Sequence, residues 1–230
     1  MTMKLLTGDL SPYSARVRMQ IYAKGLESEV EMAPADGLRT PAFIARYPLG
    51  RIPILEVGGE AIPESAVIAQ YLEEAYPTPS LLGATALENA RIRALEHVGD
   101  IHIMNPMYSV NAQGRRSTRN IGIRDLLAGL AIRGVEALER MVGTDGFACL
   151  GRLTLADCAL LPGLFLVQTI MPTIDLPDPI PGLPRVNAYW QAIQRHPIGA
   201  RVMIELNRGL EGRRAILREA ALQAKAAPAG

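Results

Sequence analysis

The sequence predicts an α/β domain followed by an all-helical domain. Residues 3–76 contain short segments in which strand and helix patterns alternate. Pro77-Thr78-Pro79-Ser80 then breaks the pattern, and after it the strand signals give way to long helical stretches. The 230 residues are enough for two cores of this kind. We therefore expect domains at 1–78 and 86–230, with 79–85 as a linker.

The first domain is predicted to have the order β-α-β-α-β-β-α. Gly25 is the stop signal of its first helix, and Gly58-Gly59 between two apolar runs is a hairpin signal. A crossover followed by a hairpin predicts a four-stranded mixed sheet with helices on it. The expected elements are a strand at Met3 to Thr7, helix at Pro12 to Lys24, strand at Glu27 to Met32, helix at Pro41 to Tyr47, strands at Ile54 to Val57 and Glu60 to Ile62, and a helix opening at Pro63-Glu64-Ser65.

The second domain is predicted to be helical throughout. Its first pattern, Leu87 to Gly114, contains Pro106, which predicts a kink or break. Arg115, Arg116 and Arg119 are expected in a solvated polar loop rather than in an anion site. Further helices are expected at Ile121 to Val142, from Thr154, at Pro184 to Arg195 and from Ile198 onward, with Pro172 to Pro184 as a proline-rich connection.

Composition narrows the classes of function. The chain is 49% hydrophobic and 20% charged, with a formal net charge of +1, which is ordinary for a soluble globular protein and predicts neither nucleic acid nor an anionic membrane as a partner. We expect no run of about 18 apolar residues and no signal peptide, and hence a cytoplasmic protein. Cys149 and Cys158 have neither metal-ligand nor CxxC spacing, and we expect both to be reduced, structural and buried.

The stretch Ser11-Pro12-Tyr13-Ser14 is the candidate active-site turn, because a hydroxyl stands at the last loop position before a helix. Unpaired N–H groups and the positive end of the helix dipole favour an anion there. Pro12 suits the first helical turn. Taken alone, Ser11 is better explained as an N-cap, so the turn needs support from the rest of the chain.

That support comes from four motifs in order. After the Ser11 turn with Arg16-Val17-Arg18 come Arg51-Ile52-Pro53, then Glu64-Ser65, then Leu153-Thr154-Leu155-Ala156-Asp157. With these motifs the chain resembles the cytosolic-type glutathione S-transferase family along essentially its whole length. It is similar to serine-type, bacterial members of that family, with a tau- or zeta-like active-site turn. The resemblance implies an N-terminal thioredoxin-like domain, glutathione as co-substrate, no metal, a homodimer and a role in detoxification.

The resemblance also implies roles for individual residues. Ser11 would donate to the glutathione sulfur and so lower the pKa of the thiol, with Ser14 as a possible substitute and Tyr13 as a weaker one. Arg16 and Arg18 are two residues apart on nearly opposite helix faces, so they cannot both serve the ligand. For glutathione itself, a cis Ile52-Pro53 bond would leave the Ile52 backbone free for the cysteinyl part, Ser65 and Glu64 would hold the γ-glutamyl group, and Arg51 would meet the glycine carboxylate.

The second substrate is expected between the domains, against the first helical segment. Met104 and Tyr108 are the candidates for its lining together with Tyr13, whereas His102 is better explained as a surface or core histidine. Thr154 and Asp157, three residues apart, look functional but are better explained as a helix-capping box with Leu153 as a staple.

Two functional hypotheses follow. In the first, the protein activates glutathione as a thiolate that attacks a small hydrophobic electrophile by conjugation, substitution or isomerisation. No thiol stands at positions 11 or 14, so thiol–disulfide exchange is not expected there. In the second, the fold survives as a non-catalytic dimeric scaffold. Ser11, Ile52-Pro53 and Glu64-Ser65 favour the enzyme, since a scaffold has no physical need for all three.

Overall fold

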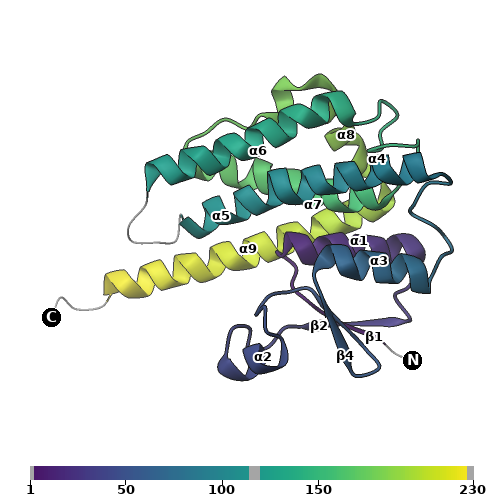
Figure 1. Ribbon diagram of the computed structural model, residues 1–230. Helices are drawn as coiled ribbons and strands as arrows, with labels where there is room; N and C mark the ends of the chain where they lie inside the picture. Colours follow the sequence, from purple (N-terminus) through teal and green to yellow (C-terminus); the bar gives the residue numbers. More distant parts are fainter. Residues whose placement is uncertain (1–2, 114–119, 227–230) are drawn as a thin grey trace.

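The computed structural model of the protein describes residues 3–113 and 120–226. The predicted loop with Arg115, Arg116 and Arg119 lies outside this range. A mixed sheet with its helices forms one half of the molecule and a helical bundle forms the other (Figure 1). The predicted fold class is confirmed.

The sheet has the strand order β2-β1-β3-β4, with β1 parallel to β2 and antiparallel to β3, and with β3 and β4 paired as a hairpin. Helices α1 and α3 lie between the sheet and the bundle, and α2 lies on the other side (Figure 1). The elements of this half are β1 (Met3–Thr7), α1 (Pro12–Lys24), β2 (Val30–Pro34), α2 (Pro41–Arg46), β3 (Ile54–Val57), β4 (Glu60–Pro63) and α3 (Ser65–Ala75).

Alternation along β1 separates two cores. Leu5 joins the large core that continues into the helical bundle, whereas the next residue, Leu6, packs with Phe43, Tyr47 and Ile54 beneath α2. Successive side chains of a strand point to opposite faces, so each face is covered by its own helices. The central strands β1 and β3 are therefore covered on both sides, whereas the edge strand β4 is mostly exposed.

The second strand begins three residues later than predicted. Gly25 ends α1 in the left-handed conformation (φ 66°) and donates to carbonyls of the last helical turn. The N–H groups of Glu29 and Val30 then turn back to the Leu26 carbonyl. Glu27 to Glu29 are used in this turn, so pairing with β1 starts only at Val30, opposite Met3.

The helical half is arranged around α7, which is buried almost along its whole length. Its elements are α4 (Ala86–His97), η1 (Val98–Met104), α5 (Asn105–Gln113), α6 (Ile121–Met141), α7 (Leu155–Ile170), η2 (Met171–Ile174), η3 (Ile180–Gly182), α8 (Pro184–Arg195) and α9 (Pro197–Ala226). Pro172 to Pro184 contains only short 3₁₀ turns, as its lack of helical period predicted.

The prediction that no stretch is long and apolar enough to span a membrane was wrong on composition. One stretch in the described part of the chain, Leu155–Ile174, has this length with a mean hydropathy of 1.5. In the structure 83% of that window is buried inside the protein. It is the central core helix of the bundle, which has the same apolar composition as a membrane span.

The predicted kink at Pro106 is a π-helical segment that ends just before it. The Asn105 N–H pairs with the Asp100 carbonyl five residues back, and α5 then begins with Asn105 and Pro106. π-helical turns inside α-helices are rare and frequently lie at functional sites. Here the segment turns Asp100 toward the α/β half, as described below.

The capping prediction for α7 is confirmed, and the cap reaches further than its own helix. Asp157 is fully buried and accepts hydrogen bonds from the Thr154 N–H (2.8 Å), the Thr154 hydroxyl (3.0 Å) and the Ala148 N–H (2.8 Å). Of the two cysteines, Cys158 is buried as predicted, but Cys149 is only half-buried because it lies in the loop before α7.

We expect Asp157→Ala to lower the free energy of unfolding by about 3 kcal/mol, because it leaves buried donors without an acceptor. Asp157→Asn, which keeps an acceptor oxygen, is the matched control and is expected to cost less. Urea unfolding measures both. A loss below about 1 kcal/mol for the alanine variant, the usual value of an exposed cap, would contradict the importance of burial.

The same carboxyl predicts a pH dependence. Burial raises the pKa of Asp157 from 3.8 to about 6. The folded state therefore binds a proton more tightly than the unfolded chain. The resulting stabilisation is complete below the unfolded pKa and is lost as the pH rises through about 6. Relative to Asp157→Asn, the wild-type free energy of unfolding should fall across this interval.

Candidate active site

Ser11 lies in the turn between β1 and α1 and is the N-cap of α1. Its extended backbone (φ −77°, ψ 115°) ends the loop, and its Oγ accepts from the Ser14 N–H at 3.2 Å. The two explanations of Ser11 are compatible. A hydroxyl that accepts through a lone pair still has its own proton to donate.

Ser14 is excluded as a substitute donor. It is fully buried, and its Oγ has no hydrogen-bond partner among the described residues. One turn into α1, its side chain faces the packed side of the helix. It lines neither of the two cavities described below.

Two adjoining cavities meet at this turn. The larger, of about 860 Å³, lies between the sheet half and the bundle and is lined by Ser11, Tyr13 and Tyr108 among others. The smaller, of about 340 Å³, is lined by Pro53, Glu64 and Ser65. Tyr13, Arg51 and Ile52 line both. Apart from Met104, the structure thus brings all the predicted site residues together around one place.

Tyr13 and Tyr108 approach each other from the two halves of the molecule, edge to face, with ring centroids 6.5 Å apart. Arg39 donates to the Tyr108 hydroxyl (3.3 Å). Burial, with a contribution from Asp100, raises the pKa of Tyr13 to about 12. Its phenol is therefore protonated at neutral pH.

Met104 does not line either cavity, which corrects the prediction. Its side chain is fully buried and packs beside Gly163 of α7. The π-helical segment shifts the helical register before Tyr108, so Tyr108 faces the cavity while Met104 and Met107 fill the bundle core. His102 is exposed and outside both cavities, in agreement with its interpretation as a surface residue.

The smaller cavity lies at the N-terminus of α3. Ile52-Pro53 is cis, as predicted, and Thr78-Pro79 is a second cis bond that we did not predict. Glu64 is the N-cap of α3 but makes no side-chain capping bond, and its backbone is left-handed (φ 69°). For a residue other than glycine this conformation is strained, and such strain clusters at binding sites. The first N–H groups of α3 remain available for an anion.

Asp100 is a site residue that the sequence reasoning missed. It lines the smaller cavity together with His97, Ile101 and Asn105. Buried Arg16 of α1 donates to Asp100 and, at 2.5 Å, to Glu96 of α4. Pro106 was the signal available, because it predicted an irregularity next to this segment.

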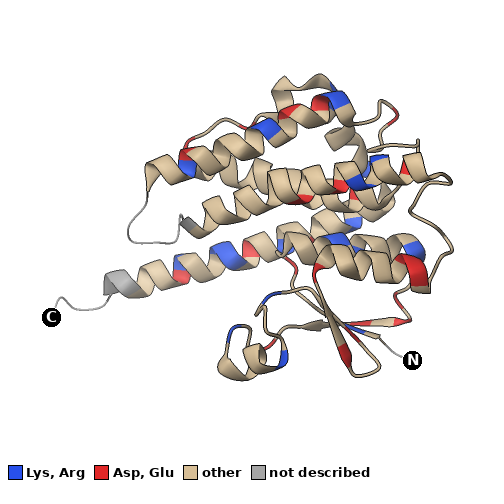
Figure 2. Ribbon diagram, in the orientation of Figure 1, with Lys and Arg blue, Asp and Glu red and all other residues tan. Residues whose placement is uncertain are grey.

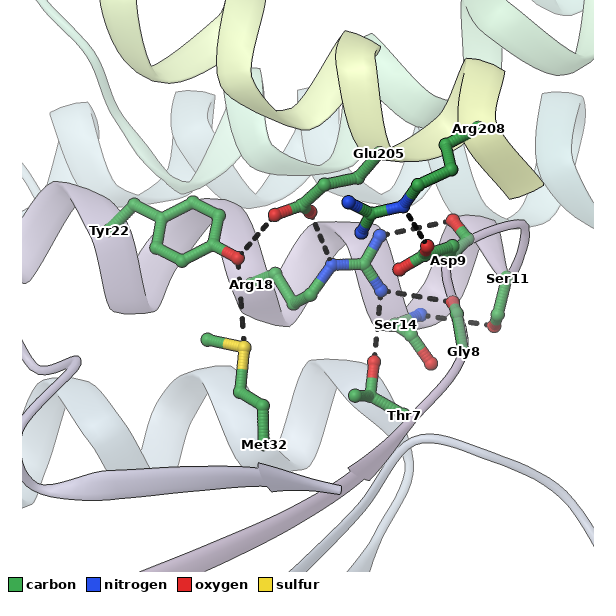
Figure 3. Close-up of polar contacts among 10 residues, drawn as sticks. All are labelled: Thr7, Gly8, Asp9, Ser11, Ser14, Arg18, Tyr22, Met32, Glu205 and Arg208. Atoms are coloured by element: carbon green, nitrogen blue, oxygen red, sulfur yellow. Dashed lines mark hydrogen bonds and ion pairs between the residues drawn. The ribbon is translucent and has the colours of Figure 1, made fainter. Parts of the chain in front are cut away.

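Arg18 forms hydrogen bonds to the residues that precede Ser11 in the turn (Figure 3). Its guanidinium donates to the Thr7 hydroxyl (2.9 Å), to the Gly8 carbonyl (3.0 Å) and to the Asp9 carbonyl (3.1 Å). Its Nε donates to Glu205 of α9 at 2.7 Å. Arg16 and Arg18 therefore do lie on different sides of α1, and both serve the structure around the site rather than lining a cavity.

Helix α9 is pressed against the same turn. Arg208 donates to Asp9 at 2.6 Å (Figure 3). One residue further along, a side chain at Gly209 would come within 2.5 Å of the Leu10 backbone nitrogen. Only glycine permits this approach. The turn that carries Ser11 is thus fixed between α1 and the last helix of the bundle.

The sheet half, with its cis-proline turn and the free N-terminus of α3, has the thioredoxin-like architecture, joined here to an all-helical half. Solved structures share this fold over most of the chain. A glutathione S-transferase of Methylobacterium radiotolerans, in complex with glutathione sulfonate, matches 88% of this chain and 94% of its own with a TM-score of 0.77 at 22% identity. One of Methylobacillus flagellatus with glutathione bound matches 87% and 98% with a TM-score of 0.75 at 22% identity.

The chain belongs to the glutathione S-transferase family. The family's N-terminal domain matches residues 5–80 and its C-terminal domain residues 122–192. Maleylacetoacetate isomerase of Pseudomonas aeruginosa is 32% identical over 202 residues, 85% of this chain and 92% of the relative. Maleylpyruvate isomerase of a Ralstonia species is 32% identical over 170 residues, 70% and 80% respectively.

Proposed function

We propose that the protein is a serine-type glutathione transferase or isomerase in which Ser11 stabilises the thiolate of bound glutathione. Family membership supports glutathione-dependent transferase or isomerase activity. The observation that carries the role of Ser11 is its position at the α1 N-terminus, facing the larger cavity next to its junction with the smaller one. A donor hydroxyl and a helix N-terminus both favour the anionic form of a thiol.

The residues of the smaller cavity fit glutathione. The uncapped N–H groups of α3 suit the γ-glutamyl carboxylate, and the carboxylate of Glu64 suits the ammonium group. The Ile52 backbone, beside Pro53, is assigned to the cysteinyl part. Arg51, exposed at the junction of the cavities, is assigned to the glycine carboxylate.

In this mechanism Ser11 keeps its proton. Its Oγ accepts from the Ser14 N–H while its O–H donates to the sulfur, and chains of this kind strengthen the donor at their end. The thiol proton is released to water, and the sulfur then attacks an electrophile that is bound in the larger cavity. The names of the relatives favour isomerisation of an unsaturated acid as one candidate reaction beside conjugation.

Three further features belong to the proposal: a homodimer, a cytoplasmic location and a role in detoxification. Family resemblance supports them. Among the described residues no group of His, Cys, Asp and Glu side chains could hold a metal ion, and the proposed chemistry uses none. The alternative function is a non-catalytic scaffold of the same fold.

Titration of the whole protein with glutathione tests the proposal. The heat of binding and the ultraviolet absorbance of the thiolate are the two quantities measured. We expect binding at millimolar concentration or below and a bound thiol whose pKa lies below the usual 8.5 or so. No binding would favour the scaffold. Tyr13→Phe is the control. It removes the other hydroxyl of the turn that faces the cavities; with Ser11 as the donor, the pKa of the bound thiol should stay in place, and a rise would assign the role to Tyr13.

A further inference from the structure

The larger cavity has an excess of positive charge. Among the described residues, five arginines line it against one carboxylate, that of Asp175; the arginines are Arg39, Arg51, Arg124, Arg213 and Arg214. Arg124 is paired with the neighbouring Asp125 at 2.7 Å, and Arg39 donates to Tyr108. Arg51 lies at the junction with the smaller cavity. The remaining two, Arg213 and Arg214, come from α9.

Leu210, Arg213, Arg214 and Leu217 form one face of α9, because they recur at i, i+3, i+4 and i+7. All four line the cavity. Figure 2 shows basic positions on this part of α9, where it runs on past α1. Among the described residues no carboxylate pairs with Arg213 or Arg214. Two guanidinium groups with no acidic partner, flanked by leucines, provide an anion site with apolar edges.

The position of this arginine pair relative to Ser11 is fixed. Gly209 contacts Leu10, the residue before Ser11, and Glu205 and Arg208 bond the same turn through Arg18 and Asp9. Arg213 follows Gly209 by four residues, which is about 6 Å along a helix at 1.5 Å per residue. The charge therefore lies a short, set distance from the thiol-activating turn.

The cavity wall also has an apolar part, with Val110 from α5 and Phe165, Leu166 and Ile170 from α7. The cavity therefore offers a ligand a hydroxyl turn, an apolar surface and two guanidinium groups. Resting on the proposed function, we propose that the electrophilic substrate carries a carboxylate that Arg213 and Arg214 bind, separated by an apolar segment from the carbon that the sulfur attacks.

A matched pair of acceptors tests this proposal. In 4-(3-oxobut-1-enyl)benzoic acid the aromatic ring separates the carboxylate from the reactive double bond, and the corresponding carboxamide is neutral and of nearly the same shape. Glutathione addition forms the sulfur–carbon bond, breaks the carbon–carbon π bond and places one proton on the α-carbon. We expect kcat/KM to favour the acid at least tenfold, mostly through KM, because charge-assisted hydrogen bonds are the stronger ones.

The double variant Arg213→Met, Arg214→Met is expected to reduce the acid-to-amide ratio about tenfold, and added salt should reduce the wild-type ratio. Arg218→Met is the control, since Arg218 is exposed on α9 and outside the cavity lining. A wild-type ratio near one, or a ratio that survives the double variant, overturns the proposal. So does weaker glutathione binding in the double variant, which would assign the two arginines to glutathione.

The test does not depend on turnover. Calorimetry with the saturated acid and its carboxamide, in the presence of glutathione, reports the anion site directly. Tenfold tighter binding of the acid, lost in the double variant, supports the inference even if neither acceptor reacts. Failure of glutathione to bind refutes the proposed function, whereas equal binding of acid and amide refutes only the anion site.

Discussion

Ser11→Ala is expected to lower kcat/KM for glutathione addition by about 100-fold, the usual effect of losing one donor to a developing or bound anion. The hydroxyl is the proposed donor to the sulfur, and the α1 N-terminus alone is expected to stabilise the thiolate less. The pKa of the bound thiol should rise accordingly, so the rate at neutral pH should fall more than the rate at high pH. A pH profile of kcat and the thiolate absorbance measure this.

Ser14→Ala is the matched control for that experiment. The Ser14 hydroxyl is buried and has no hydrogen-bond partner in the described part of the chain, while its backbone N–H, which alanine keeps, makes the bond to Ser11 Oγ. Activity and thiol pKa are therefore expected to stay at wild-type values. An unchanged rate in Ser11→Ala would remove the hydroxyl from the mechanism, and a loss in Ser14→Ala would mean that packing around α1 decides the rate.

Arg18→Met is expected to destabilise the protein by about 3–5 kcal/mol, the usual cost of removing one partner of a buried ion pair. Its side chain is 2% exposed and that of Glu205 only 12%. Without the guanidinium, Glu205 keeps only the Tyr22 hydroxyl as a donor among the described residues (2.6 Å). The Asp9 carbonyl loses the donor from Arg18, whereas the Gly8 carbonyl still accepts from the Ser11 N–H (3.0 Å). Urea unfolding gives the free energy, and glutathione turnover reports the turn that the arginine held.

Arg201→Met distinguishes this effect from the general loss of an ion pair on α9. Arg201 also pairs across the two halves, with Glu27 at 2.7 Å, but the two side chains are 50% and 41% exposed. Such pairs are worth about 1 kcal/mol or less. Equal losses of unfolding free energy in the two variants would show that the burial of Arg18 does not determine its contribution to stability.

Local pattern was sufficient for most of the fold. The apolar spacing, Gly25 and Gly58-Gly59 placed the helices and the hairpin within a few residues, since these signals act between near neighbours in the chain. The start of β2 was misplaced because the turn after Gly25 uses backbone groups of the Leu26 segment, which only three-dimensional pairing with β1 reveals.

The site was predictable where a motif carries its own geometry, as at Ser11, Ile52-Pro53 and Glu64-Ser65. It was not predictable where the helical register decides which side chain faces the cavity. One π-helical segment placed Met104 in the core and Asp100 at the cavity. The contacts of α9 with the turn could not be predicted from the sequence either, because Glu205 and Arg208 are almost 200 residues away in the chain from the residues that they bind.

The contacts of α1 also restrict which chimeras can combine the α/β half of one relative with the helical half of another. Chain order places α1 with the sheet, but Arg16 bonds to α4 and η1, Arg18 bonds to α9, and Lys24 donates to the Pro79 carbonyl in the connecting segment (2.7 Å). A chimera cut between α3 and α4 would separate two buried arginines from their carboxylates. Recombination of helical halves among relatives, by evolution or by design, should therefore succeed only when the α1 residues that face the bundle come from the same parent protein as the bundle.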